Sequence, residues 1–172
     1  MKLSETPSST VRCSFDSPLG PMTLCASDKG LAGAWFDGQK HMPATDAWPV
    51  QADHPVLREA QAQLRQYFAG QRQVFALPLC IPGGTAFQQA VWHGLLAIPA
   101  GATTSYGALA QRLGKPAAVR AVGAAVGRNP VTIIVPCHRV VGADGSLTGY
   151  AGGLERKTAL LQLEHNGHPL FS

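Results

Sequence analysis

Residues 105–127 read SYGALAQRLGKPAAVRAVGAAVG, and their pattern predicts the architecture of the C-terminal half. Ser105 is a favoured residue at a helix N-cap, so a short helix is expected over 106–113. Residues 114–116 form a tight turn, and the proline within it suits the first turn of a further helix that ends near residue 127. A short helix, a tight turn and a second helix together predict a helix-turn-helix motif.

The second helix of this motif has a bare outer face. On a wheel of about 100° per residue, Val119, Val122 and Val126 fall together and are expected to face the core. The opposite side carries three methyl groups and one guanidinium, from Ala117, Ala121, Ala124 and Arg120. Helices that read base edges in the major groove need several long donors, whereas a smooth helix with one arginine favours the minor groove and extrusion of a base. The alternative is that the alanines pack against another part of the protein.

The N-terminal half has the pattern of a small antiparallel sheet covered by a helix. Short strands are expected at 10–15, 22–26 and 31–36, where turn sequences separate the apolar runs. Apolar residues at helical spacing predict a helix over 55–69. A stretch rich in proline and glycine at 77–84 reads as a linker, so we expect two domains, residues 1–84 and 85–172.

Further elements are expected around the helix-turn-helix motif. A helix capped by Thr85 should continue until Pro99 stops it. Residues 131–135 are typical of a buried strand. Residues 140–141 and 147–148 flank an Asp-Gly turn like the hairpin of a small wing, and a last helix is expected over 153–164. The predicted fold class is α+β.

Composition and charge restrict the kind of protein. The chain has 172 residues, of which 45% are apolar, and this excludes a disordered or fibrous protein. The net charge of +4 belongs to residues 101–172, and no acidic residue stands between Glu59 and Asp144, which favours a polyanionic partner. The sequence has no apolar run long enough to cross a membrane and no signal-peptide pattern, so we expect a cytoplasmic protein.

One of the four cysteines has neighbours that suit a nucleophile. Cys137 and His138 are adjacent in VPCHRV, residues 135–140. A thiol is mostly protonated at neutral pH and needs a base or a positive charge to supply thiolate, and His138 and Arg139 offer both. Glu164 in the last helix is a candidate to orient the imidazole, as in a hydrolase triad. The cysteines show no spacing typical of metal ligands, so we expect no metal and no cofactor.

The segments NPV at 129–131 and IVPCHRVV at 134–141 resemble the signature of the methylated-DNA–protein-cysteine methyltransferases, the O6-alkylguanine-DNA alkyltransferases. The resemblance covers nearly the whole chain, through DSPLG, FQQAVW, SYG and GYAGGL at 16–20, 87–92, 105–107 and 149–154. It implies an N-terminal domain of ribonuclease-H-like topology and a C-terminal winged helix-turn-helix domain.

The resemblance also implies DNA repair by direct reversal of damage. Cys137 takes a methyl or other alkyl group from O6 of guanine, and from O4 of thymine, in a single irreversible turnover. His138 deprotonates Cys137 through a water, Glu164 orients His138, and Asn129 braces the turn that follows the recognition helix. The implied partner is double-stranded DNA, which a monomer contacts in the minor groove largely without sequence preference.

Further residues receive roles from the same resemblance. Arg120 occupies the stack vacated by the flipped guanine, while Tyr106 crowds the phosphate of the flipped nucleotide and donates to the leaving guanine. Val126, Tyr150 and the backbone of Ala151 line the pocket. Many relatives have serine at the position of Ala151, so a hydroxyl contact to O6 is absent here.

A further departure from the family and two alternatives accompany this interpretation. Some relatives bind zinc in the N-terminal domain, but Cys13 and Cys25 do not stand where those ligands fall. A non-catalytic module that binds lesions, or a DNA-binding module regulated by its thiol, is the main alternative to alkyl transfer. A cysteine hydrolase is the other alternative, and it would turn over repeatedly on an ester or peptide.

Overall fold

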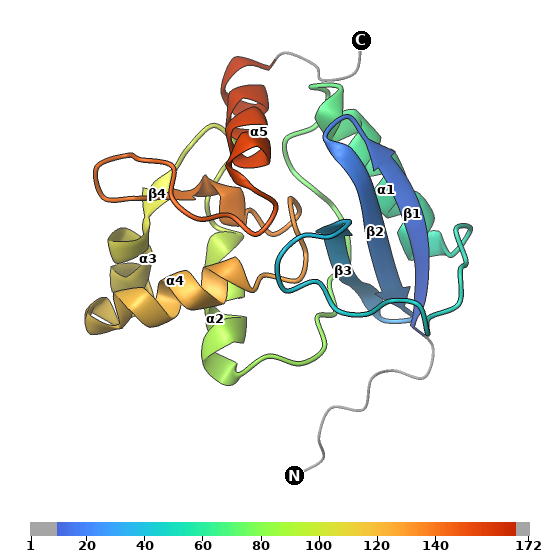
Figure 1. Ribbon diagram of the computed structural model, residues 1–172, viewed down its shortest axis with the longest axis horizontal. Helices are drawn as coiled ribbons and strands as arrows, with labels where there is room; N and C mark the ends of the chain where they lie inside the picture. The colour runs from blue at the N-terminus through green and yellow to red at the C-terminus, as the bar shows by residue number, and fades with distance from the viewer. Residues whose placement is uncertain (1–9, 168–172) are drawn as a thin grey trace.

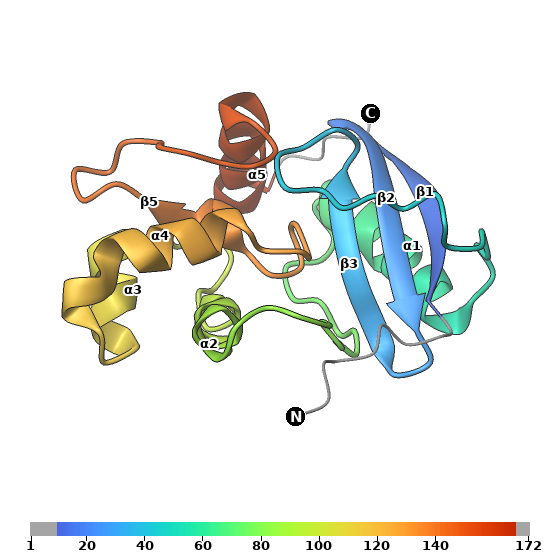
Figure 2. The same ribbon diagram turned by 60° about the horizontal axis from the view of Figure 1, so that its bottom comes forward.

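The computed structural model describes residues 10–167, whose fold has two parts that lie side by side (Figures 1 and 2). The first part is an antiparallel sheet in sequence order, with one helix packed on one of its faces (Figure 2). Its elements are β1 (Val11–Ser17), β2 (Gly20–Ser27), β3 (Gly30–Phe36) and α1 (Pro55–Phe68). The predicted sheet and helix of the N-terminal half are therefore confirmed.

The sheet packs on α1 through alternating side chains. Val11, Cys13 and Phe15 are buried along β1, while the residues between them are more exposed, as a strand with one covered face requires. The helix contributes an apolar stripe that includes Leu57 and Leu64, both fully buried. This contact forms the core of the first part.

The second part is built from helices and two very short strands. Its elements are α2 (Ala86–Leu95), β4 (Thr104–Ser105), α3 (Tyr106–Arg112), the 3-10 turn η1 (Pro116–Ala118), α4 (Val119–Gly127), the 3-10 turn η2 (Cys137–Arg139), β5 (Val140–Val141) and α5 (Leu154–Asn166). Ser105 caps α3 by accepting from the Ala108 N–H at 3.0 Å. The helix-turn-helix expected from the sequence is confirmed as α3, η1 and α4, and α2 packs against α4 with a hydrogen bond from Trp92 Nε1 to the Ala125 carbonyl at 2.8 Å.

The buried strand predicted over 131–135 is wrong. Ile133 has a φ of 77°, in the left-handed region, and the Val135 N–H returns to the Val131 carbonyl at 2.9 Å. The segment is therefore a tight loop. Its first residues instead cover the edge of β3, because Ala34 donates to the Pro130 carbonyl and Thr132 donates to the Ala34 carbonyl, each at 2.9 Å. Those bonds satisfy groups that an open sheet edge would leave exposed.

The predicted wing hairpin is also wrong in its pairing. Val140 and Val141 pair in parallel with Thr104 and Ser105 of β4. In the sequence, β4 precedes the helix-turn-helix motif and β5 follows it. Residues 147–148 form no strand. The Asp-Gly turn itself is present, closed by a bond from the Gly142 N–H to the Ser146 carbonyl at 2.8 Å.

One position of the predicted core stripe of α4 differs. Val122 and Val126 are buried as expected, but Val119 is 39% exposed and Ala125 is buried instead. On the helix wheel Val119 lies about 60° from Val122, on the side away from Ala125. Val119 therefore stands at the edge of the buried sector.

Gln39 joins the two parts of the fold through its buried side chain. Its Oε1 accepts from the Phe36 N–H at 2.8 Å and from the Thr132 hydroxyl at 3.2 Å. Thr132 belongs to the loop that covers β3, so this amide links the sheet to the segment that leads to Cys137.

We expect Gln39→Leu to lower the free energy of unfolding by about 1–3 kcal/mol, because it leaves two buried donors without their acceptor. Urea denaturation of the variant and of the wild type measures the difference. Gln73→Leu, at an exposed position, serves as the control and should change the stability by much less. Equal stability of Gln39→Leu and the wild type would contradict this role.

Candidate active site

Cys137 is buried but opens into a cavity beside the recognition helix. The residue is the first of η2 and is 7% exposed. A cavity of about 510 Å³ reaches its side chain, with walls that include Tyr106, Gly123, Val126, Tyr150 and Ala151. The structure thus brings together residues from α3, α4 and the loop before α5 around one sulfur. Lys40 and Arg128, both exposed, place positive charge at the same cavity.

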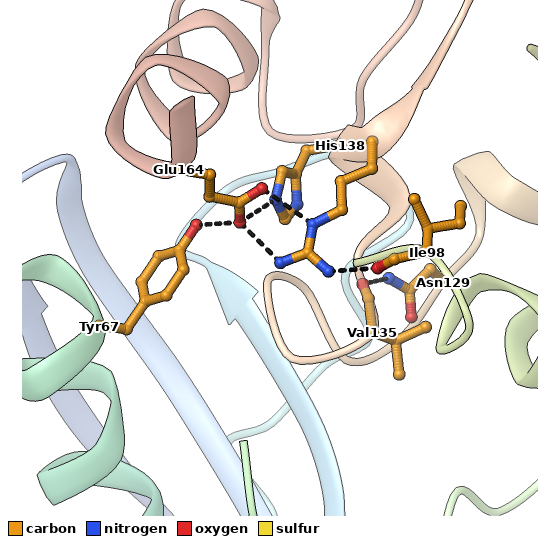
Figure 3. Close-up of polar contacts among 7 residues, drawn as sticks. Tyr67, Ile98, Asn129, Val135, His138 and Glu164 are labelled. Carbon is orange, nitrogen blue, oxygen red and sulfur yellow. Dashed lines mark hydrogen bonds and ion pairs between the residues drawn. The ribbon is translucent and has the colours of Figure 1, made fainter. Parts of the chain in front are cut away.

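The carboxylate of Glu164 lies at the centre of a buried polar cluster (Figure 3). His138 Nε2 is 2.7 Å from Glu164 Oε2. Arg139 donates from Nε to Glu164 Oε1 at 2.8 Å and from Nη2 to Glu164 Oε2 at 2.9 Å. Tyr67 donates its hydroxyl to Oε2 at 2.6 Å, and Arg139 also donates to the Ile98 carbonyl at 2.6 Å. The predicted proximity of His138 and Glu164 is therefore present in the structure.

The ionisation of this cluster follows from its burial and its hydrogen bonds. Burial alone would raise the pKa of Glu164, but the hydrogen bonds and charges of His138 and Arg139 outweigh it and lower the pKa from 4.5 to about 2. Burial lowers the pKa of His138 below its usual 6.5, although Glu164 partly opposes this. At neutral pH the pair is therefore a neutral imidazole beside an ionised carboxylate.

The Cys137 thiol is protonated at rest for a similar reason. Burial raises the pKa of the thiol above 9.0, and the Asn129 amide and the Lys157 ammonium only partly offset it. Lys157 is itself fully buried, and burial lowers its pKa. A thiol in this state reacts only when a base takes its proton.

Asn129 fixes the loop that carries Cys137. Its side-chain nitrogen donates to the Val135 carbonyl at 2.7 Å, and its side-chain oxygen accepts from the Val131 N–H at 3.0 Å. The amide thus bridges both ends of the tight loop between α4 and η2, and Figure 3 shows its bond to the Val135 carbonyl. This geometry agrees with the bracing role that the sequence resemblance implies.

The loop before α5 is held from two sides. Lys157 donates to the carbonyls of Val140, Thr148 and Gly149 at 2.6, 3.0 and 3.3 Å. From the sheet side, the Lys40 N–H donates to the Ala151 carbonyl at 3.1 Å. These bonds set the position of the cavity wall that faces Cys137.

The sequence is similar to one family of known proteins along both parts of the fold. The DNA-binding-domain model of the 6-O-methylguanine DNA methyltransferases matches residues 86–166, and their ribonuclease-like-domain model matches residues 11–81. The chain belongs to the 6-O-methylguanine DNA methyltransferase family. The family name given to its curated relatives is methylated-DNA–protein-cysteine methyltransferase, and the chain is a member of this enzyme class.

Relatives with known sequences and structures cover most of the methyltransferase chain. The protein of Methanosarcina acetivorans is 48% identical over 151 residues, which are 87% of this chain and 95% of that protein. The protein of Mycobacterium leprae is also 48% identical over 151 residues, 88% of this chain and 90% of its own. The crystal structure of Mycobacterium tuberculosis OGT in complex with DNA has 46% identity and a TM-score of 0.83, with 92% of this chain and 98% of that chain covered.

The outer face of α4 in the methyltransferase is exposed. Solvent reaches each of the residues that the helix wheel placed there, namely Ala117, Arg120, Ala121 and Ala124. The alternative in which the alanines pack against another part of the protein is therefore wrong. Ala117 lies in η1 rather than in α4, because the helix begins with a 3-10 turn.

The sequence analysis did not predict the positions of three polar residues of the methyltransferase site. Arg139, expected to favour a thiolate at Cys137, instead turns toward Glu164. Lys157 supplies positive charge near the Cys137 sulfur. Its inward position could have been predicted from the helical spacing, because positions 157, 160 and 164 share one face of α5 and are all buried. Tyr67 lies on the buried stripe of α1, but nothing in the sequence names its distant partner.

The structure also bears on metals and membranes. Within residues 10–167, no group of three histidine, cysteine or acidic side chains is arranged to hold a metal ion. No helix within that range has both the length and the apolar character that a membrane crossing requires.

We expect the Glu164 carboxylate to make stability depend on pH below about 4.5. Its folded-state pKa is depressed, so its contribution is present above the unfolded pKa and is lost as the pH falls through the folded pKa near 2. The stability difference between wild type and Glu164→Gln should shrink by about 3 kcal/mol between these limits. Urea unfolding of both proteins over this range measures it, and a difference that stays constant would contradict the expectation.

Proposed function

We propose that this protein repairs DNA by moving an alkyl group from O6 of guanine in duplex DNA to the sulfur of Cys137, once per protein molecule. The observation that carries the proposal is a buried thiol that opens into a cavity beside an exposed recognition helix. The neutral His138 next to it, backed by an ionised Glu164, supports the chemistry.

The first step is removal of the thiol proton. If the imidazole carries its proton on Nε2, which faces Glu164, then Nδ1 is free to act as a base. Nδ1 is buried and has no hydrogen-bond partner among the described residues. A water between Nδ1 and Sγ carries the proton to His138, and Glu164 stabilises the imidazolium that forms.

The second step is displacement at the alkyl carbon. A bond forms between Sγ and this carbon while the bond from the carbon to O6 breaks, and the electron pair stays with the guanine. The Tyr106 hydroxyl at the cavity donates a hydrogen bond to the leaving guanine, which then takes up a proton from solvent, while the imidazolium of His138 returns its proton to solvent. A thioether has no further leaving step, so the protein is consumed. An alkyl group on O4 of thymine is a substrate of the same chemical class.

The target base reaches the cavity by leaving the duplex. The bare outer face of α4 suits the minor groove, where Arg120 fills the stack that the rotated nucleotide vacates. Gly123 and Ala124 belong to this helix and also line the cavity, so the helix on the DNA leads directly to Cys137. Val126, Tyr150 and the Ala151 backbone contact the flipped base. The protein acts as a monomer and reads little sequence, because the helix face offers few donors to base edges.

Incubation with duplex DNA that contains O6-methylguanine should place one methyl group on the peptide with Cys137. Mass analysis of the digested protein measures this, and the titration should end at one methyl group per molecule. Cys137→Ser should remain unmodified. Tight binding without modification would favour a lesion-binding module, and repeated turnover on an ester or peptide would favour a hydrolase.

Arg120→Ala should slow the repair of duplex DNA by about tenfold or more, because unstacking a base costs a few kcal/mol that the arginine no longer offsets. The reaction with free O6-benzylguanine should change little, since a free base needs no extrusion. Arg112→Ala provides a matched control, as an exposed arginine of α3 outside the α4 face. Equal losses on duplex DNA and on the free base would rule out the role of Arg120.

A further inference from the structure

Tyr67 brings the first part of the fold into the polar cluster of the second. The residue belongs to α1 and is 1% exposed. Its hydroxyl donates to Glu164 Oε2 at 2.6 Å, from the side of the carboxylate opposite His138 (Figure 3). Among the hydrogen bonds of residues 10–167, it is the one contact that Glu164 receives from the first part of the fold.

Tyr67 shares its acceptor atom with His138. Glu164 Oε2 accepts from the Tyr67 hydroxyl, from Arg139 and from His138, at distances between 2.6 and 2.9 Å. Hydrogen bonds to an ionised group are strong. Several donors that bind one carboxylate oxygen share its negative charge, so each donor experiences less of it. The negative charge that His138 experiences is thus reduced by the phenol on the other side of the carboxylate.

The hydroxyl has no packing role that would explain it. The Tyr67 ring packs against Phe68 and Phe75, with ring centroids 5.3 and 5.4 Å away, and a phenylalanine ring would make the same contacts. A phenol needs a partner when it is buried, and this one finds the same oxygen that faces the candidate base. Burial and the neighbouring Glu164 raise the pKa of Tyr67 well above 10.0, so the phenol stays a donor.

We propose that Tyr67 is a positioning residue for the alkyl transfer, holding the Glu164 carboxylate in place and limiting the proton affinity of His138. The inference rests on the proposed function of Cys137 and His138. It gives the first part of the fold a share in the reaction, although the residues that the proposed function places against the alkylated base all belong to the second part.

The direction of the effect follows from the groups around His138. Glu164 of α5 raises its proton affinity, while burial, Arg139 of η2 and Lys157 of α5 lower it. Arg139 lowers the pKa of the Tyr67 phenol electrostatically and Tyr150 raises it. Removing the hydroxyl leaves a stronger negative charge on Glu164, so His138 binds a proton at a higher pH. A protonated His138 cannot take the thiol proton.

The test compares Tyr67→Phe with the wild type through the rate of reaction with free O6-benzylguanine, measured from acidic to alkaline pH. We expect a rate about tenfold lower at neutral pH, the scale of an orienting hydrogen bond to a charged group, and an acid limb moved to higher pH. Nitrogen-15 NMR of the His138 ring should report the same upward shift in its titration. Leu64→Val, a fully buried change in the same helix, is the control and should keep the pH profile of the wild type.

The outcomes separate this inference from the proposed function. A wild-type protein that places no alkyl group on Cys137 would overturn the proposed function. A wild type that reacts, with a Tyr67→Phe variant that keeps the same acid limb and the same His138 titration, would overturn only the role of Tyr67. If Tyr67→Phe does not fold, 3-fluorotyrosine at this position keeps the shape and strengthens the donor, and it should move the acid limb to lower pH. An unmoved limb would again overturn the role.

Discussion

The fold and the site both depend on one buried carboxylate. Glu164 is 6% exposed, and an ionised group at such a position is costly unless it is paired and hydrogen-bonded. Its donors come from α1 and from η2, which are far apart in the sequence, and Tyr67 and Glu164 are separated by 97 positions. The hydrogen bonds to this charge therefore fix how α1 of the first part, η2 and α5 pack together. They also hold the His138 imidazole in the segment that carries Cys137.

A second constraint is the shape of the backbone around Cys137. Asn129 and Lys157 use their polar side-chain atoms to bind main-chain groups, namely carbonyls for both residues and also the Val131 N–H for Asn129. This use is typical of residues that fix loops where regular structure is absent, since buried carbonyls need donors. The tight loop with Ile133 in a left-handed conformation is held by such bonds, and it places the sulfur at the cavity. The backbone geometry of the site is thus set by hydrogen bonds within the protein.

Recognition and chemistry occur along the same short path. The exposed face of α4 has small side chains and one arginine, its inner face packs on α2, and its last turn leads through Asn129 to the cysteine loop. In the proposed function a base that leaves the duplex at α4 travels only into the adjoining cavity. A long, donor-rich helix would read sequence but would keep the backbone away from the DNA, whereas damage must be repaired wherever it occurs.

Features that depend on neighbours within a few residues could be predicted before the structure was known. Capping by Ser105, helical spacing in α1 and α4, and the VPCHRV segment were sufficient for the helix-turn-helix, the first sheet with its helix, and the candidate thiol and imidazole. Three features became clear from the fold alone: residues 131–135 form a loop, β5 pairs with β4, and Tyr67 and Arg139 complete the environment of Glu164. Local patterns record capping and periodicity, while strand pairing and the satisfaction of a buried charge are decided by groups brought together from distant parts of the chain.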